Sequence, residues 1–374
     1  MRTLYIGLMS GTSMDGVDGV LVDLAHIDQG QLAVRAHAHR AFEPALAQAL
    51  LVLNTSGDDE LHRAALAANA LSRVYAAVVD DLLGASGAAA VAVDAIGAHG
   101  QTVRHRPGEF DGTGYTLQLN NPALLAELCG IDVVADLRVR DVAAGGQGAP
   151  LVPGFHRAVF GETGRTTAVV NIGGMSNVTV LDANGRTFGW DCGPGNVLMD
   201  HWCRVHTGNA FDAGGTWAAS GQVDTALLAG MLGEPYFSKV PPKSTGRDLF
   251  HADWLRAQLQ RLPRSLPAVD VQATLAELTA ACVADELNRG AASARAVLIC
   301  GGGAYNAHLV GRIAARLPGV TVAPTDARGL PADQVEACAF AWMARAWRHR
   351  QCASLPDVTG ARGPRVLGAL YPAG

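Results

Sequence analysis

The sequence lacks the features of membrane, secreted and nucleic-acid-binding proteins. No window approaches roughly 18 uninterrupted apolar residues, and the first apolar stretch, LYIGLM, is too short for the core of a signal peptide. The net charge of −5 provides no basic surface for nucleic acid. The 7 cysteines are scattered, odd in number and without a CxxC pair, which argues against a disulfide scaffold or a zinc site. We therefore expect a cytoplasmic protein with neither a membrane nor a nucleic-acid partner.

Glycine, in contrast, is abundant. It occupies 44 of 374 positions, well above the usual fraction of about 7%. The glycines form short clusters between apolar runs, which predicts tight turns that contact a ligand. A chain of this length is expected to fold as about two domains, and 49% of its residues are hydrophobic, so it can bury ample apolar surface.

Strand and helix patterns alternate along the chain and predict an α/β fold. Strands are expected at 5–9, 17–24, 90–100, 131–137, 165–182 (two strands around a turn), 186–190 and 296–303. Helices are expected at 43–84, 121–130, 271–290, 304–317 and 334–350. The order strand, glycine-rich turn, strand occurs at 5–24 and again at 165–182. This weak repeat indicates two related α/β lobes, although two ordinary hairpins would give the same pattern.

The first glycine-rich turn, SGTSMDG (10–16), has two interpretations. GTSM is typical of the nucleophile region of a subtilisin-like protease, and His99 follows in AHGQTVRH (98–105). In that class the triad order is Asp, His, Ser, whereas Ser13 precedes every histidine here. The protease serine also begins a long helix, but residues 15–19 are poor helix formers. A convergent serine–histidine pair stays open, yet the pattern favours a phosphate cradle.

The phosphate interpretation depends on three glycine-rich turns. A turn of Gly, Ser and Thr directs peptide N–H groups and hydroxyls at one point, which suits an anion. SGTSMDG lacks the GK[ST] ending of a P-loop and precedes a strand, so it is not a Walker A site. It is similar to the phosphate-binding hairpins of the sugar-kinase, actin and heat-shock-protein superfamily. Two such hairpins, with VLICGGGAYN (297–306) in the place of the adenosine turn, predict a nucleotide-binding fold of that superfamily.

Longer motifs narrow the resemblance to one family. The chain contains LMSGTSMDGVD, GAHGQTVRH, VVNIGGMSNVTVL, GWDCGPGNVLMD, PPKSTGRDLF, DVQATLAELTA, CGGGAYN and EACAFAWMA. Over essentially its whole length it resembles the anhydro-N-acetylmuramic acid kinase family. One departure is visible, because the family usually has DFRRRD where this chain has DLRVRD (136–141), with Val139 in place of the middle arginine.

The resemblance implies a fold and a reaction. The fold is a two-lobed actin-like (ribonuclease H-like) ATPase with a central nucleotide cleft, and we expect lobes at 1–135 plus 337–374 and at 136–336. The reaction uses ATP, Mg²⁺ and water to open the bridge of 1,6-anhydro-N-acetylmuramic acid and to phosphorylate O6. The products are N-acetylmuramic acid 6-phosphate and ADP, in peptidoglycan recycling by a homodimer.

Two alternatives to this reaction remain. One is a conventional sugar kinase of the same superfamily, which phosphorylates an ordinary hydroxyl. The other is a nucleotide-driven switch of the actin or chaperone type. Such a switch would need a partner-binding domain or a filament surface, whereas two lobes account for all 374 residues.

Asp191 is the expected catalytic base, and the resemblance places it at the family's catalytic position. Glycoside hydrolysis ordinarily needs a carboxylate that activates water and an acid that protonates the leaving oxygen. Capture of O6 by phosphorus makes the acid dispensable, so one carboxylate suffices. An aspartate that only caps the CGPGN turn is the structural alternative.

The remaining expected site residues bind nucleotide, metal or sugar. Nucleotide is expected at Gly11, Thr12, Ser13, Met14, Asp15, Gly16, Val17 and Asp18, at Asn171, Gly173 and Gly174, and at Gly301, Gly302 and Gly303, with Asp15 orienting Mg²⁺ through water. Sugar is expected at His99, Gln101, Arg140 and Glu336. A guanidinium suits the lactyl carboxylate, and Arg138 is the second candidate for this contact.

Several of these assignments have a structural alternative. The glycine trio could form a tight turn without a ligand, His99 could be a structural histidine, and Glu336 could simply favour a helix N-terminus. In PPKSTGRD (241–248), Lys243 and Arg247 are expected to contact phosphate or a neighbouring subunit, and the sequence does not decide between these.

Overall fold

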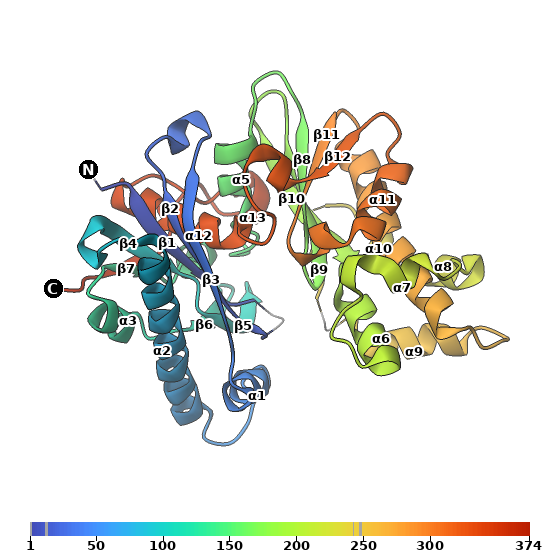
Figure 1. Cartoon of the computed structure of the whole chain (residues 1–374), viewed down its shortest axis with the longest axis horizontal. Coiled ribbons are helices and arrows are strands. Elements are labelled where there is room, and N and C mark those ends of the chain that lie inside the picture. Colours follow the sequence, from blue (N-terminus) through green and yellow to red (C-terminus); the bar gives the residue numbers. More distant parts are fainter. Residues whose placement is uncertain (1, 12–13, 242, 247–248) are drawn as a thin grey trace. The chain divides into compact units, whose positions relative to one another are not determined.

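The computed structural model describes residues 2–11, 14–241, 243–246 and 249–374, which form two compact units (Figure 1). The first unit contains the residues up to 160 and residues 334–374, and the second contains residues 161–333. We expected the second lobe to span residues 136–336. Residues 136–160 and 334–336 instead belong to the first unit. One tie of residues 136–160 to the first unit is Asp141, which accepts a hydrogen bond from Thr359 Oγ1 at 2.8 Å.

The sheet of the first unit has the order β13-β7-β4-β1-β2-β3. Its strands are β1 (Leu4–Met9), β2 (Gly16–Asp23), β3 (Ala33–Ala41), β4 (Val93–Ala98), β7 (Val133–Ala135) and β13 (Ala369–Tyr371), and a separate ribbon pairs β5 (Gln101–Pro107) with β6 (Gly114–Leu119). The helices are α1 (Pro44–Val52), α2 (Glu60–Ser86), α3 (Pro122–Cys129), α4 (Val139–Ala143), α5 (Pro153–Phe160), α12 (Val335–Arg348) and α13 (Pro356–Thr359).

Helices α2 and α12 cover opposite faces of this sheet. Side chains alternate between faces along a strand, and Ile6 and Leu8 join the core cluster that contains the apolar residues of α2. Gly7 faces α12, where a Cβ would lie 1.8 Å from the Ala337 carbonyl oxygen, and Gly97 meets Phe340 in the same way at 2.0 Å. Glycine at both positions therefore lets the α12 backbone lie directly on β1 and β4.

The sheet of the second unit has the order β10-β9-β8-β11-β12. Its strands are β8 (Thr167–Ile172), β9 (Met175–Leu181), β10 (Thr187–Pro194), β11 (Ala296–Cys300) and β12 (Thr321–Pro324). Its helices are α6 (Val197–Thr207), α7 (Thr216–Ala219), α8 (Thr225–Leu232), α9 (Ala252–Gln260), α10 (Ala268–Gly290) and α11 (Ala307–Arg316). Short 3₁₀ helices include η4 (Pro235–Ser238) and η5 (Gly302–Tyr305).

Helix α10 is buried on every side through most of its length, which marks it as the central helix of the second unit. Its two buried acidic side chains are both paired with cations. Glu277 accepts a hydrogen bond from Arg316 Nε at 2.7 Å, and Glu286 accepts one from Lys243 Nζ at 2.7 Å.

The two sheets share one topology. In each, three antiparallel strands, β1-β2-β3 or β8-β9-β10, are followed by two parallel strands on the other side of the first strand, β4-β7 or β11-β12. This strand order is that of the ribonuclease H-like fold, and its presence in both units is the actin-like arrangement. The predicted internal repeat and the predicted fold class are confirmed.

Candidate active site

In the first unit, hydrogen bonds to buried polar groups hold the start of the β1–β2 turn. Ser10 Oγ lies 3.0 Å from the Tyr75 hydroxyl, which also accepts a hydrogen bond from the Gly100 peptide at 3.1 Å. Gln101 Nε2 donates to the Gly11 carbonyl at 3.1 Å. These contacts tie the turn to the loop after β4, so the predicted nucleotide turn and two predicted sugar residues belong to one local structure.

The predicted nucleotide residues of this turn differ in what they can offer a ligand. The Val17 side chain is fully buried and Met14 packs against the core, so both could contribute only backbone groups. Asp18 Oδ1 lies 2.9 Å from His39 Nδ1. Burial raises the pKa of Asp18, but hydrogen bonds from His37 and His39 outweigh it and hold the pKa below its usual value. Thr12 and Ser13 lie outside the described residues.

A second cluster in the first unit joins His99 to Arg138. His99 is 4% exposed, and its Nε2 accepts a hydrogen bond from Arg138 Nε at 3.0 Å. Burial, and then the charge of Arg138, hold the pKa of His99 well below its usual value, so the imidazole is neutral. Arg138 also donates from Nη1 to the Gly148 carbonyl at 2.8 Å, and burial lowers its pKa to about 10.

Gln101 and Glu336 extend this cluster. Gln101 is fully buried, and its Oε1 accepts no hydrogen bond from the described residues. Glu336 lies in the first turn of α12, where burial raises the pKa of its carboxyl and the charge of Arg138 opposes this rise. A buried polar atom without a partner is costly in a folded protein, so the cluster has the character of a ligand site.

The structure places Arg138 beside His99 and leaves Arg140 on the surface. Arg138 is the residue before α4, whereas Arg140 is an exposed position on this helix. Two residues along a helix turn the side chain through about 200°, which points Arg140 away from the cluster. The next residue, Asp141, is fully buried and accepts a hydrogen bond from the Gly148 peptide at 2.8 Å.

In the second unit, the β8–β9 turn and the loop after β10 form one structure. The Gly173 carbonyl accepts a hydrogen bond from the Asn196 peptide at 2.8 Å, and the Gly174 carbonyl accepts one from the Gly195 peptide at 2.9 Å. Ser176 Oγ adds a bond to the Gly193 carbonyl at 3.2 Å. The predicted second nucleotide turn therefore lies beside the CGPGN loop that follows Asp191.

The three glycines after β11, Gly301 to Gly303, lie next to the β8–β9 turn. β11 pairs in parallel with β8, and Cys300 lies opposite Asn171. Gly301 has φ of +78°, and a Cβ on it would lie 2.3 Å from Asn171 Oδ1. That oxygen is buried and has no partner among the described residues. The sheet thus brings the predicted residues Asn171, Gly173, Gly174 and Gly301 together, with Gly302 and Gly303 directly after them.

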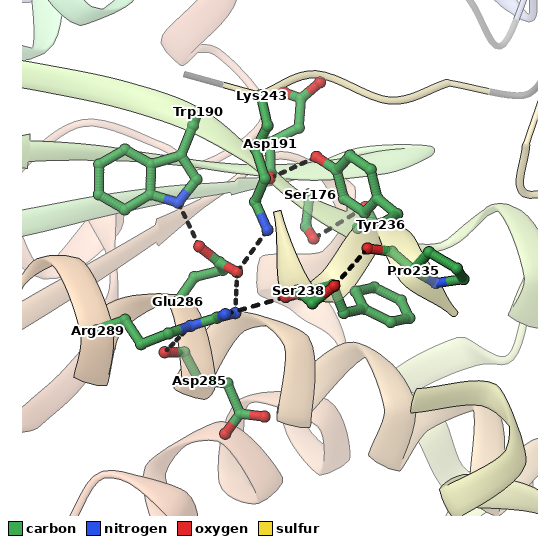
Figure 2. Close-up of polar contacts among 12 residues, drawn as sticks. Ser176, Trp190, Asp191, Pro235, Tyr236, Ser238, Lys243, Asp285, Glu286 and Arg289 are labelled. Carbon is green, nitrogen blue, oxygen red and sulfur yellow. Dashed lines mark hydrogen bonds and ion pairs between the residues drawn. The ribbon is translucent and has the colours of Figure 1, made fainter. Parts of the chain in front are cut away.

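Asp191 is held by a segment far from it in the sequence. Its Oδ2 accepts a hydrogen bond from the Thr245 peptide at 3.0 Å, and its own peptide donates to the Lys243 carbonyl at 3.2 Å. The Tyr236 hydroxyl donates to the Asp191 carbonyl at 2.8 Å (Figure 2). The β9–β10 register shifts between Asp191 and Gly193, and such bulges redirect side chains next to active sites.

The protonation of Asp191 suits a general base. Burial raises the pKa of Asp191 from 3.8 to about 6. The hydrogen bond from the Thr245 peptide and the positive charge of Lys243 act in the opposite direction, but they are outweighed. A carboxyl with this pKa is ionised at neutral pH and is still basic enough to accept a proton during a reaction. None of the described residues donates a hydrogen bond to its other oxygen, Oδ1.

Comparison with known proteins identifies the family. The family model described as anhydro-N-acetylmuramic acid kinase matches residues 3–373. The chain is 61% identical to the anhydro-N-acetylmuramic acid kinase of Variovorax paradoxus, over 99% of each chain. It is 56% identical to that of Albidiferax ferrireducens over 100% of both chains. The chain belongs to the anhydro-N-acetylmuramic acid kinase family. The prediction made from the motifs is confirmed, and neither alternative, the conventional sugar kinase or the nucleotide-driven switch, is supported.

Solved structures give a weaker likeness. An activator of 2-hydroxyisocaproyl-CoA dehydratase from Clostridium difficile, with bound ADPNP, is 16% identical at a TM-score of 0.48 and covers 93% of this chain and 97% of its own. A ROK family glucokinase from Streptomyces griseus, in complex with glucose and AMPPNP, is 16% identical at a TM-score of 0.41, covering 91% of this chain and 99% of its own. In the described part of the chain, no helix is both long and apolar enough to cross a membrane.

The sequence missed one part of this kinase's site, the buried ion pair of Lys243 and Glu286 next to Asp191. Lys243 does not offer its ammonium to a phosphate or to a neighbouring subunit, because its side chain is 2% exposed and paired with Glu286. Arg247, the other cation of that motif, lies outside the described residues. No local pattern could reveal the pair, since Glu286 lies 43 residues further along the chain.

Proposed function

We propose that the chain opens the 1,6-anhydro bridge of anhydro-N-acetylmuramic acid and transfers the γ-phosphoryl group of ATP to O6. The observation that carries the proposal is the setting of Asp191, a largely buried carboxylate held through one oxygen, with a pKa raised to about 6. It lies on the strand that leads into the loop packed on the second nucleotide turn.

The bond changes are as follows. Water attacks the anomeric carbon and loses a proton to Asp191 Oδ1 while the bond between that carbon and O6 breaks. O6 forms a bond to the γ-phosphorus, and the bond from that phosphorus to the β-γ bridging oxygen breaks, which releases ADP. Asp191 then passes its proton to solvent. No general acid is needed, because phosphorus captures the leaving oxygen.

We propose that the sugar binds to the cluster of His99, Gln101, Arg138 and Glu336. The neutral His99 and the unpartnered Gln101 oxygen suit hydroxyl and amide groups. We now favour Arg138 over Arg140 for the lactyl carboxylate, because Arg138 contacts His99 and Arg140 does not.

We propose that ATP binds the two glycine-rich hairpins and the turn at Gly301–Gly303. Bound Mg²⁺ would neutralise charge on the phosphates during transfer. Among the described residues, no group of three or more His, Cys, Asp and Glu side chains could hold a metal. We propose that Asp15 orients the ion through water, since Mg²⁺ usually keeps several water ligands when it binds to phosphates. The family resemblance further implies a cytoplasmic homodimer that acts in peptidoglycan recycling.

The test is turnover in ¹⁸O-water followed by mass spectrometry. The proposed reaction places the heavy oxygen on the anomeric carbon of the phosphorylated product. A conventional kinase incorporates none, provided that the product is analysed before its anomeric hydroxyl exchanges oxygen with water. Asp191→Asn should bind ATP as the wild type does and lose turnover by about 10²-fold or more. A product without label, or full turnover by Asp191→Asn, would rule the proposal out.

A further inference from the structure

Glu286 is the centre of a buried polar cluster behind Asp191 (Figure 2). It accepts hydrogen bonds from Lys243 Nζ at 2.7 Å and from Trp190 Nε1 at 2.7 Å, and it pairs with Arg289 Nη2. The side chains of Lys243 and Glu286 are each 2% exposed. Removing an ammonium from water costs several kcal/mol unless it is paired, so Glu286 determines where the Lys243 side chain can be.

The backbone of Lys243 is at the same time attached to Asp191. Its carbonyl accepts a hydrogen bond from the Asp191 peptide at 3.2 Å, and two residues later the Thr245 peptide donates to Asp191 Oδ2 at 3.0 Å. Its ammonium lies 4.8 Å from the centre of the Tyr236 ring, whose hydroxyl donates to the Asp191 carbonyl. Lys243 thus connects helix α10, through Glu286, to the segment whose Thr245 peptide holds the Asp191 carboxylate.

We propose that Lys243, anchored by Glu286, is a positioning residue for Asp191. Its buried side chain fixes the Thr245 peptide against one oxygen of the carboxylate, which leaves the other oxygen for water. Its ammonium also supplies the positive charge that faces the base. This inference rests on the proposed function, because it assigns Lys243 a role through Asp191 and none through direct contact with substrate.

The positive charge of Lys243 lowers the pKa of Asp191, so removing it should raise that pKa. Burial raises the pKa of Asp191, and the Thr245 peptide and the charge of Lys243 oppose this rise. The other titratable or charged groups of the cluster are Tyr236 of η4, Cys192 of β10, and Cys282, Asp285, Glu286 and Arg289 of α10. Loss of the Lys243 cation, with these groups in place, raises the pKa of the base and moves the acidic limb of the activity profile to higher pH.

The test compares Lys243→Met with Lys239→Met. Lys239 is an exposed matched control, with its ammonium 5.8 Å from the centre of the same Tyr236 ring and no bond to Glu286. For Lys243→Met we expect the acidic limb of kcat/KM to move up by about one pH unit. We also expect kcat at its plateau to fall about tenfold because the base is less well placed, with KM for ATP unchanged. Lys239→Met should match the wild type.

The proposal is overturned if the acidic limb of kcat/KM for Lys243→Met lies at the same pH as the limbs for Lys239→Met and the wild type. Because Lys243→Met leaves Glu286 with one cation fewer, a second variant separates charge from packing. Lys243 is one of four residues, with Lys239, Val240 and Ser244, that line a pocket of about 510 Å³. Lys243→Ala removes the buried side chain next to this pocket, and a small amine can be offered in its place. Propylammonium should restore activity to Lys243→Ala, and 1-propanol, of similar shape but uncharged, should not. Equal effects of the two compounds would show that Lys243 only fills space.

Asp191→Asn distinguishes failure of this inference from failure of the proposed function. If Asp191→Asn is inactive and the Lys243 variants behave like the wild type, only the positioning role is refuted. If Asp191→Asn keeps full turnover, the assignment of the base is itself wrong and the inference falls with it.

Discussion

Asp191→Asn should make the protein more stable at neutral and alkaline pH, although we expect it to slow turnover by about 10²-fold or more. Burial is the main reason that the pKa of Asp191 is raised from 3.8 to about 6, so the ionised carboxylate is less stable in the folded state than in the unfolded chain. Asparagine has nearly the same shape and keeps a carbonyl oxygen for the Thr245 peptide. It carries no charge that has to be removed from water.

The two pKa values give the size and the sign of the effect. One pKa unit corresponds to about 1.36 kcal/mol, so the rise from 3.8 to about 6 amounts to about 3 kcal/mol at most. The folded state has the higher pKa and binds the proton more tightly. The cost is therefore complete above a pH of about 6 and disappears as the pH falls toward 3.8. For a unit the size of residues 161–333, a gain of about 3 kcal/mol raises Tm by about 6–12 °C.

Differential scanning calorimetry of the wild type and Asp191→Asn at about pH 8 and about pH 4 measures this difference. Asp253→Asn is the control, because the Asp253 side chain on α9 is 71% exposed, and we expect it to change stability by less than about 0.5 kcal/mol. A lower Tm for Asp191→Asn at the alkaline pH, or a difference that does not shrink on acidification, would refute the reasoning.

Two further predictions concern the nucleotide turn and the sugar cluster. Gly301→Ala should destabilise the protein by about 1–3 kcal/mol and weaken ATP binding in calorimetry, because its φ is +78° and the new Cβ would meet Asn171. Gly311→Ala, on α11 with open space around it, should instead stabilise by about 0.5–1 kcal/mol; similar losses in both would contradict the argument. Arg138→Lys should raise KM for the sugar about tenfold or more because it loses the planar fork, whereas Arg140→Lys should leave KM within about twofold. The opposite order would restore Arg140 as the partner of the lactyl carboxylate.

The glycine-rich turns could be located from sequence because their pattern is local. The strands around SGTSMDG and around the turn at 173–174 have short apolar runs bounded by glycine, and the structure has β1–β2 and β8–β9 there. The long helix predicted at 43–84 is two helices, α1 and α2. β3, the β5–β6 ribbon, β12 and β13 were not predicted. They lie at sheet edges, in a separate ribbon or are very short, where burial leaves a weaker apolar pattern.

The cluster around Asp191 could not be predicted in full for a different reason. The sequence pointed to Asp191 itself, because a lone carboxylate before a glycine-rich turn is a recognisable pattern. It gave no reason to join Lys243 to Glu286, since the two residues are 43 positions apart and Glu286 is one of several acidic residues of α10. Likewise, the choice between Arg138 and Arg140 depends on where α4 begins, and a shift of one residue changes which side chain points inward.

The sequence by itself determined the family, the two-fold repeat of the α/β unit and the glycine-rich turns, because each is encoded by residues adjacent in the chain. Only the tertiary structure decided the protonation of Asp191, the burial of Lys243 and the arginine that joins His99. These properties depend on desolvation and on charges brought together from distant segments, and both exist only once the chain is folded.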